Sequence, residues 1–147
     1  MQLPPFFYEI FDPSLPRLGP GSAEQTHRAL DRLLAARDRE RSGAAPEDSP
    51  LRILDIGCGT GAQTLDLARR LVGPITAVDN HRPYLDELER RAEAAGLGGR
   101  IHTRQDDMAA LDLPAGAFDV IWAESSIFVV GLAPGLQAWR PLLAPGG

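Results

Sequence analysis

The residues best suited to chemistry lie in one stretch, residues 51–61, where an acid precedes three alternating glycines. A β-branched run ends in Asp55, and Gly57, Gly59 and Gly61 follow. Glycine permits positive φ angles and lets a ligand touch main-chain atoms. The apolar residues that come next recur at helical spacing, so the glycines form a strand-to-helix turn. In an open α/β sheet, such a turn at the carboxyl end of a strand is where a nucleoside ligand binds.

Asp55 decides between two kinds of nucleoside ligand. In a dinucleotide site the pyrophosphate sits on the helix N-terminus, drawn by free N–H groups and the helix dipole. A carboxylate two residues before the first glycine repels a pyrophosphate and favours a ligand with a positive end, such as S-adenosylmethionine. The spacing alone leaves the alternative open, because residues 57–62 also satisfy the G-x-G-x-x-G/A pattern of NAD(P)-dependent oxidoreductases.

Further polar residues follow the next two predicted strands. Asp79 is placed to accept hydrogen bonds from both hydroxyls of a ribose, or to cap the following helix; Asn80 can help in either role. Asp107 can accept from the exocyclic N–H of adenine, while Met108 offers a backbone N–H and an apolar contact. A surface-loop acid is the alternative for Asp107, and Asp106 is its immediate rival.

Glu124 follows the fourth predicted strand at the same rim of the sheet. Its carboxylate can flank the reacting atoms, or it can cap a helix. We interpret Cys58 as a small residue of the glycine turn rather than as a nucleophile. The three histidines show no metal-ligand spacing, so we expect no metal site.

Composition narrows the classes of protein. The 147 residues suffice for one domain, with 44% hydrophobic and 24% charged residues. A net charge of -5 argues against a nucleic-acid partner, which would need clustered Lys and Arg. The single cysteine cannot form an internal disulfide, and no apolar run nears the ~20 residues that span a bilayer. With no leader at its start, we expect a cytoplasmic protein without a membrane partner.

The chain divides into an N-terminal arm (1–21), a helix and linker (22–50) and a core (51–147). The expected strands are 51–56, 74–79, 100–104 and 118–122; the expected helices are 22–39, 61–71, 82–95 and a short one at 136–143, interrupted by Pro141. Strands that alternate with helices imply right-handed crossovers and a mostly parallel sheet. The chain looks like a fragment truncated after its fourth strand, whose open edge favours association with a second copy.

The arm carries four aromatic residues within six positions: Phe6, Phe7, Tyr8 and Phe11. We interpret them as apolar packing of the arm, with an acceptor pocket or a lid as the alternative.

These residues resemble the class I S-adenosylmethionine-dependent methyltransferases. The matching segments come in the family's order and are 54–61, 77–79, 107–108, 118–122 and 145–147. Residues 17–22 (Arg-Leu-Gly-Pro-Gly-Ser), with 122–128 and Gly131, are similar to a bacterial subgroup of small-molecule methyltransferases. The resemblance implies a Rossmann-like sheet of strand order 3-2-1-4-5-7-6, in which this chain lacks strands 5, 7 and 6.

The resemblance also implies methyl transfer from S-adenosylmethionine to a small-molecule acceptor, with Glu124 lining the transfer site. We nominate Glu124 as the general base there. The implied cofactor-binding residues are Asp55, Gly57, Cys58, Gly59, Thr60 and Gly61 for the methionine part, Asp79 for the ribose, Asn80, Asp107 and Met108 for the adenine, and Arg17 to Ser22, including Gly21, closing over the cofactor. The alternatives are an NAD(P)-dependent oxidoreductase and a non-catalytic module that binds a cofactor or a partner.

Overall fold

Four parallel strands form one sheet in a computed structural model that describes residues 4–40 and 49–147. The strands are β1 (Ile53–Ile56), β2 (Ile75–Asp79), β3 (Ile101–Gln105) and β4 (Val120–Trp122), in the order β3-β2-β1-β4. In the register, Ile53 of β1 pairs with Ile75 on one side and with Val120 on the other. The expected parallel α/β sheet is confirmed, and its order matches the 3-2-1-4 part of the order that the resemblance implies.

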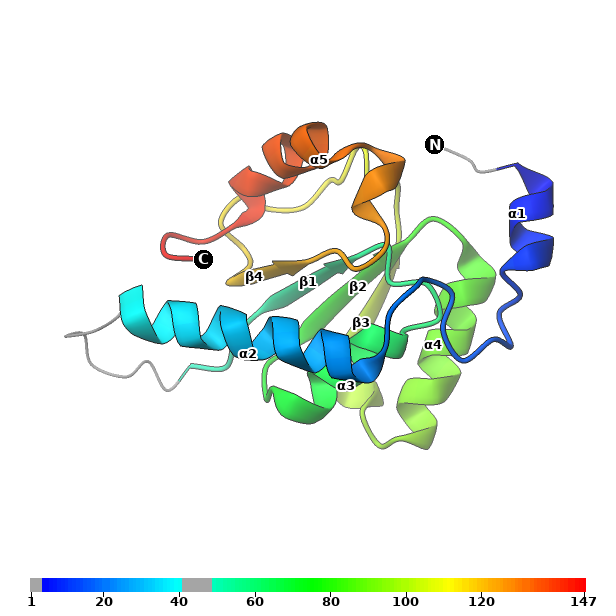
Figure 1. Cartoon of the computed structure of the whole chain (residues 1–147), viewed down its shortest axis with the longest axis horizontal. Coiled ribbons are helices and arrows are strands. Elements are labelled where there is room, and N and C mark those ends of the chain that lie inside the picture. Colours follow the sequence, from blue (N-terminus) through cyan, green and yellow to red (C-terminus); the bar gives the residue numbers. More distant parts are fainter. Residues whose placement is uncertain (1–3, 41–48) are drawn as a thin grey trace.

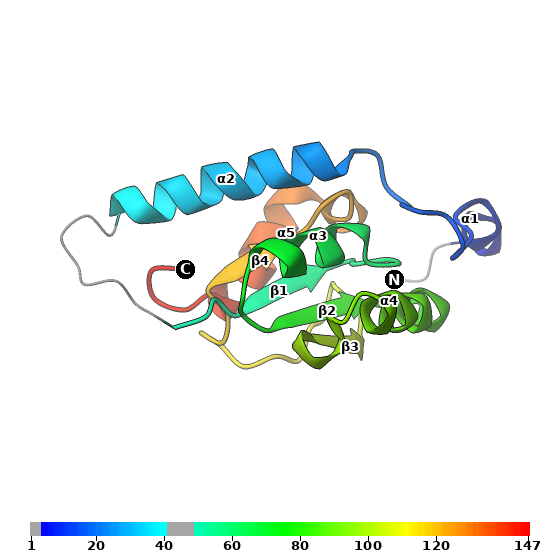
Figure 2. The same ribbon diagram turned by 90° about the horizontal axis from the view of Figure 1, so that it is seen from below.

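Helices cover both faces of the sheet, as Figures 1 and 2 show. The helices α2 (Ala23–Glu40), α3 (Ala62–Arg70) and α4 (Arg82–Ala94) pack on one face, and α5 (Leu132–Trp139) packs on the other, flanked by the 3₁₀ turns η2 (Ile127–Val129) and η3 (Arg140–Leu142). Side chains of a strand alternate between faces. Ile53 therefore joins the core beneath α2 to α4, whereas Leu54 and Ile56 join the core beneath α5. Asp55 lies on the α3 side.

The N-terminal arm contains a short helix that the sequence did not predict, α1 (Pro5–Ile10). Tyr8 stacks on His81 with ring centroids 4.1 Å apart, and His81 meets Tyr84 edge-on at 4.5 Å. The Tyr84 hydroxyl donates to the Phe11 carbonyl at 2.7 Å. Aromatic packing of the arm is therefore confirmed, and it places α1 beside the N-terminal end of α4.

Arg91 of α4 holds the rest of the arm in place. Its guanidinium donates to the carbonyl oxygens of Pro13, Leu15 and Pro16 at 2.9–3.2 Å, and to the Thr60 hydroxyl at 3.2 Å. One side chain thus ties the arm to the turn that follows β1.

The last helix differs from its prediction. It begins at Leu132 rather than at 136, because Pro134 lies in the first turn, where proline is tolerated. Pro141 does not interrupt a helix but lies in the separate turn η3. The other predicted helices begin and end within two residues of those observed. At the start of α2, Ser22 Oγ accepts the Gln25 N–H at 3.4 Å, as the capping pattern predicts.

β4 is one edge of the sheet. The strand begins at Val120, two residues later than predicted, and Phe118 instead forms an isolated bridge with Leu143. Self-association through this edge stays a prediction. Within the described ranges, no helix combines the length and the apolar character needed to cross a bilayer.

Candidate cofactor site

The glycine turn joins β1 to α3 and has the left-handed backbone that the sequence predicts. Gly57, Gly59 and Gly61 have φ angles of 73°, 54° and 80°. The N–H groups of Gly57 and Cys58 donate to the Val78 carbonyl at 2.8 and 3.0 Å. The turn is therefore fixed to the carboxyl end of β2.

Two of these glycines also leave no room for a side chain. A Cβ at position 57 would lie 2.4 Å from Ser126 Cβ, and one at position 61 would lie 2.1 Å from Leu88 Cδ1. Ser126 donates its hydroxyl hydrogen to the Ile56 carbonyl at 2.6 Å, which fixes the loop after β4 against the turn. Glycine is needed here for close approach as well as for positive φ.

A cavity lies at the carboxyl ends of the strands, bounded by the glycine turn, the arm and the loops after β2, β3 and β4. The predicted site residues that line it are Arg17, Gly57, Cys58, Gly59, Thr60, Asp79, Asn80, Asp107, Met108 and Glu124. Three predicted residues do not line it: Asp55, Gly21 and Gly61. The cavity is also lined by three aromatic residues of the arm, Phe7, Tyr8 and Phe11. These side chains therefore form one wall of the cavity in addition to packing the arm against the domain.

Asp55 points away from the cavity, toward α3, and is 0% exposed. Its Oδ2 accepts from Thr64 Oγ1 at 2.6 Å and from Gln63 Nε2 at 3.3 Å. Its Oδ1 has no partner among the described residues. Burial raises the pKa of Asp55 to about 7, although the bonds from Thr64 and Gln63 oppose the shift. The prediction of direct cofactor contact is therefore not supported by the direction of this side chain.

Asp79 ends β2 and faces the cavity. Its two oxygens accept the N–H groups of Gly59 and His81, each at 2.9 Å. The alternative of a helix cap is not what the structure shows, because α4 begins after His81 and has no side-chain cap bond. Burial raises the pKa of Asp79, against the effect of these hydrogen bonds.

The loop after β3 brings two acids and Met108 to the cavity. Asp107 Oδ1 accepts the Ala109 N–H at 2.9 Å, whereas Asp106 Oδ2 accepts from Arg104 Nε at 2.9 Å. The Met108 carbonyl accepts from Trp139 Nε1 at 2.9 Å. Asp106 is engaged by Arg104, and the roles predicted for Asp107 and Met108 at the adenine stay predictions.

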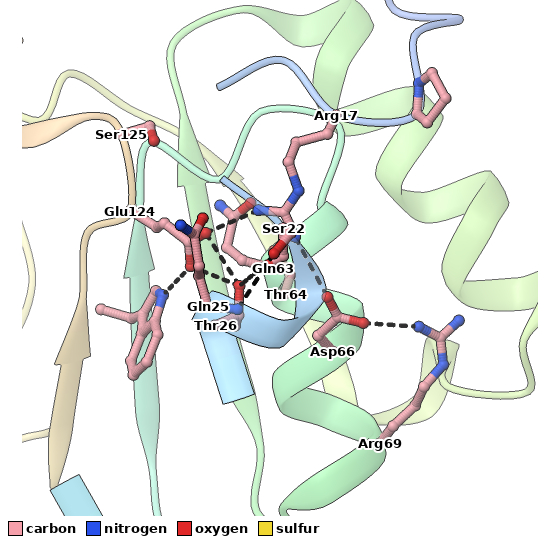
Figure 3. A network of polar contacts seen from close by, with 12 residues as sticks. Arg17, Ser22, Gln25, Thr26, Gln63, Thr64, Asp66, Arg69, Glu124 and Ser125 are labelled. Carbon is pink, nitrogen blue, oxygen red and sulfur yellow. Dashed lines mark hydrogen bonds and ion pairs between the residues drawn. The ribbon is translucent and has the colours of Figure 1, made fainter. Parts of the chain in front are cut away.

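Glu124 lies at the centre of a polar network that joins the arm, α2 and the end of β4 (Figure 3). Its Oε1 accepts from Arg17 Nη1 at 2.8 Å, and Thr26 Oγ1 lies 2.9–3.0 Å from both oxygens. Trp122 Nε1 donates to Oε2 at 3.1 Å. The helix-cap alternative is wrong, because η2 has no side-chain cap bond. Both oxygens of Glu124 are thus engaged by side chains of the protein, so the geometry does not favour the predicted general base.

Residues 17–22, which we call the strap, run over the rim of the site. Arg17 Nη2 donates to Asp66 of α3 at 3.4 Å, which complements its bond to Glu124 (Figure 3). The Ser125 hydroxyl donates to the Pro20 carbonyl at 3.0 Å. A Cβ at Gly19 would lie 2.5 Å from Ser125 Cβ. The strap is thus held against both α3 and the loop after β4.

Two further questions about the site are whether Cys58 is a nucleophile and whether a group of side chains could hold a metal ion. Cys58 is buried, and this burial raises the pKa of its thiol well above the usual value, which fits a small residue of the turn rather than a nucleophile. Within the part of the chain that the structure describes, no three His, Cys, Asp or Glu side chains form a group that could hold a metal ion.

Sequence reasoning missed Gln63, Thr64 and Arg91. Gln63 and Thr64 are buried polar side chains on the first turn of α3. Polar residues on the buried side of a helix, directly after a glycine turn and an acid, were the available signal. No sequence signal identified Arg91, because it binds backbone carbonyl groups, which are present in every residue.

Comparison with known proteins agrees with the class that fold and site define. The model of a family described as "Methyltransferase domain" matches residues 53–147, and the chain belongs to this family. Its sheet order and glycine turn are those expected of the class I S-adenosylmethionine-dependent methyltransferases.

Individual relatives are similar to between 63% and 100% of the chain. The chain is 37% identical over 108 residues to trans-aconitate 2-methyltransferase of Streptomyces avermitilis, covering 69% of this chain and 38% of that protein. It is 39% identical over 98 residues to demethylmenaquinone methyltransferase of Thermus thermophilus, covering 63% and 44%. A methyltransferase structure from Thiobacillus denitrificans, in complex with S-adenosylhomocysteine, shares the fold at a TM-score of 0.74 and 24% identity, covering 100% and 54%. The chain spans less than half the length of these two curated relatives.

Proposed function

We propose that this chain binds S-adenosylmethionine and serves the transfer of its methyl group to a small-molecule acceptor. The observation that carries the proposal is Asp79 at the cavity wall, bonded to the glycine turn through the Gly59 N–H. The family match and the relatives support it. They give no support to the oxidoreductase alternative.

The residues present fit this cofactor. An ionised carboxylate has about four lone-pair sites. Asp79 uses two of them on the N–H groups of Gly59 and His81, and the backbone of Asn80 also bonds to it, so its remaining acceptor capacity can serve a ribose hydroxyl. The buried carboxylate of Asp55 contributes negative charge behind the turn, where the cationic end of the ligand would lie. The acids that line the cavity disfavour a pyrophosphate for the same reason.

The chemistry of the proposal follows from alignment. When bound, the cofactor would supply an electrophilic methyl carbon, from which a nucleophile of the acceptor could displace the neutral thioether S-adenosylhomocysteine in line. The chain would orient the ligand at the turn, and its strap and aromatic wall would exclude water. Such alignment is worth about 7–11 kcal/mol in favourable cases. A catalytic role for Glu124, a cytoplasmic location and self-association remain predictions.

Replacement of Asp79 tests the proposal. We expect Asp79→Asn to weaken binding of S-adenosylhomocysteine by about 10- to 100-fold, because bonds to a charged partner are worth about 1.5–3 kcal/mol. Isothermal titration calorimetry measures this, with Asp86→Asn on an exposed part of α4 as the matched control. Tight NADH binding by the native chain, without S-adenosylhomocysteine binding, would reverse the proposal.

The charges of the cavity also bear on the acceptor. Among the described residues that line it, the ionised side chains are four acids and one base: Asp79, Asp106, Asp107, Glu124 and Arg17. Arg17 is already bonded to Glu124 and Asp66. Phe128 and Val129 add apolar surface to the lining of the cavity. These features favour a neutral acceptor with an apolar body.

We therefore expect a neutral ortho-dihydroxy aromatic to bind the S-adenosylhomocysteine complex at least about 10-fold more tightly than trans-aconitate, because like charges brought together cost several kcal/mol. Competitive calorimetry at low salt measures the ratio. Added salt should reduce this ratio, because it screens the repulsion between the acids of the cavity and the tricarboxylate. Tighter binding of the tricarboxylate would contradict the inference.

A further inference from the structure

The side-chain amide of Gln63 has a fixed orientation. Its Nε2 donates to two acceptors, the Asp55 carboxylate at 3.3 Å and the Cys58 carbonyl at 3.1 Å. An amide nitrogen carries two hydrogens, and both are used here. Gln63 is 7% exposed, so it is held among its neighbours rather than in solvent.

The reverse orientation of this amide is excluded by chemistry. Rotating the amide by 180° would aim its oxygen at a carboxylate oxygen and at a carbonyl oxygen, which are both acceptors. The nitrogen must therefore face Asp55 and Cys58, and the oxygen must occupy the other position.

The amide oxygen is the part of Gln63 that remains for a ligand. Gln63 lines the cavity, whereas Asp55 does not. No hydrogen bond to Gln63 Oε1 is made by the described residues, and this atom is not among the fully enclosed ones. A carboxylate that accepts from the amide N–H polarises the amide and strengthens its oxygen as an acceptor.

We propose that Gln63 Oε1 accepts a hydrogen bond from the α-ammonium of the cofactor's amino-acid end, and that Asp55 acts as a positioning residue through the Gln63 amide. This inference rests on the proposed function and replaces the predicted direct contact of Asp55. Asp55 then acts on the ligand through one amide and through the charge behind it. Thr64, the other donor to Asp55, shares the carboxylate without reaching the cavity.

The experiment compares two ligands that differ at the amino-acid end. S-adenosylhomocysteine has the α-ammonium, whereas 5′-methylthioadenosine keeps the adenosine and the sulfur but lacks the amino acid. We expect Gln63→Met, which has similar length and no acceptor oxygen, to weaken S-adenosylhomocysteine about 10-fold. It should change the affinity for 5′-methylthioadenosine by less than about 2-fold.

Thr64→Val is the matched control, because it removes a donor to Asp55 and leaves the cavity wall intact. It should weaken S-adenosylhomocysteine less than Gln63→Met does, and thermal unfolding checks that both variants fold. Equal weakening of both ligands in Gln63→Met would show a merely structural role and overturn the inference. Unchanged binding of both ligands would also overturn it. Failure of the native chain to bind S-adenosylhomocysteine would instead reject the proposed function itself.

Discussion

The Asp55→Asn variant is expected to unfold at a higher temperature than the native chain above pH 7, and to bind S-adenosylhomocysteine about 10-fold more weakly. Both effects have one cause. Asp55 is fully buried, and one of its oxygens has no partner among the described residues. A neutral amide avoids the desolvation of a charge, but it cannot attract an ammonium group.

The pH dependence of this stability gain has a definite sign. Burial raises the pKa of Asp55 from 3.8 to about 7, so between these values the folded state binds more protons than the unfolded state. Stability conferred by the protonated form is therefore fully present below pH 3.8 and is lost as the pH rises through about 7. The pKa difference corresponds to on the order of 4 kcal/mol.

Thermal unfolding of both proteins from pH 4 to pH 8 measures the effect. The difference in melting temperature should be near zero at pH 4 and reach roughly 10 °C at pH 8, because each kcal/mol corresponds to about 2–4 °C. Asp112→Asn, at an exposed position, is the matched control. A difference that does not change with pH would contradict the argument.

The second large effect is expected of Gly57→Ala, which should destabilise the chain by about 2–4 kcal/mol and weaken S-adenosylhomocysteine by about 100-fold. Alanine at φ 73° is strained, and its Cβ would lie 2.4 Å from Ser126 Cβ. Relief of this clash must move the turn or the loop after β4, and displacements near 1 Å can cost about 100-fold in function.

The variant Gly116→Ala separates the cost of a positive φ angle from the cost of the close contact at position 57. Gly116 has a similar φ of 67°, but a Cβ there meets nothing within 4 Å. We expect it to lose only about 1–2 kcal/mol. Denaturant unfolding and calorimetry of both variants, and of Gly57→Ala combined with Ser126→Gly, measure the coupling. If Gly57→Ala resembles Gly116→Ala, the close approach is not what position 57 requires.

The features that the sequence predicted are local ones. Strand periodicity and the glycine spacing located the parallel sheet and the turn. The position of Asp79 at the cavity was predictable because Asp79 ends β2. These patterns depend on neighbours a few residues apart. They are visible without knowledge of how the elements pack.

The features that the sequence could not predict depend on how the elements pack. The direction of Asp55 follows from the alternation of β1 together with the side of the sheet that α3 covers. Arg17 and Glu124 meet across 107 positions of sequence. The six residues of α1 are too few to form a stable helix alone, and ring contacts with His81 stabilise it.

The chain contains two tryptophans, and the indole of each donates a hydrogen bond to a residue that lines the cavity. Trp122 binds the Glu124 carboxylate, and Trp139 binds the Met108 carbonyl. They lie on opposite sides of the sheet, one beside the strap and the other beneath the loop after β3. Intrinsic emission from this protein is therefore an unlabelled optical readout of both walls, and single Trp→Phe replacements assign each part of the signal to its own wall.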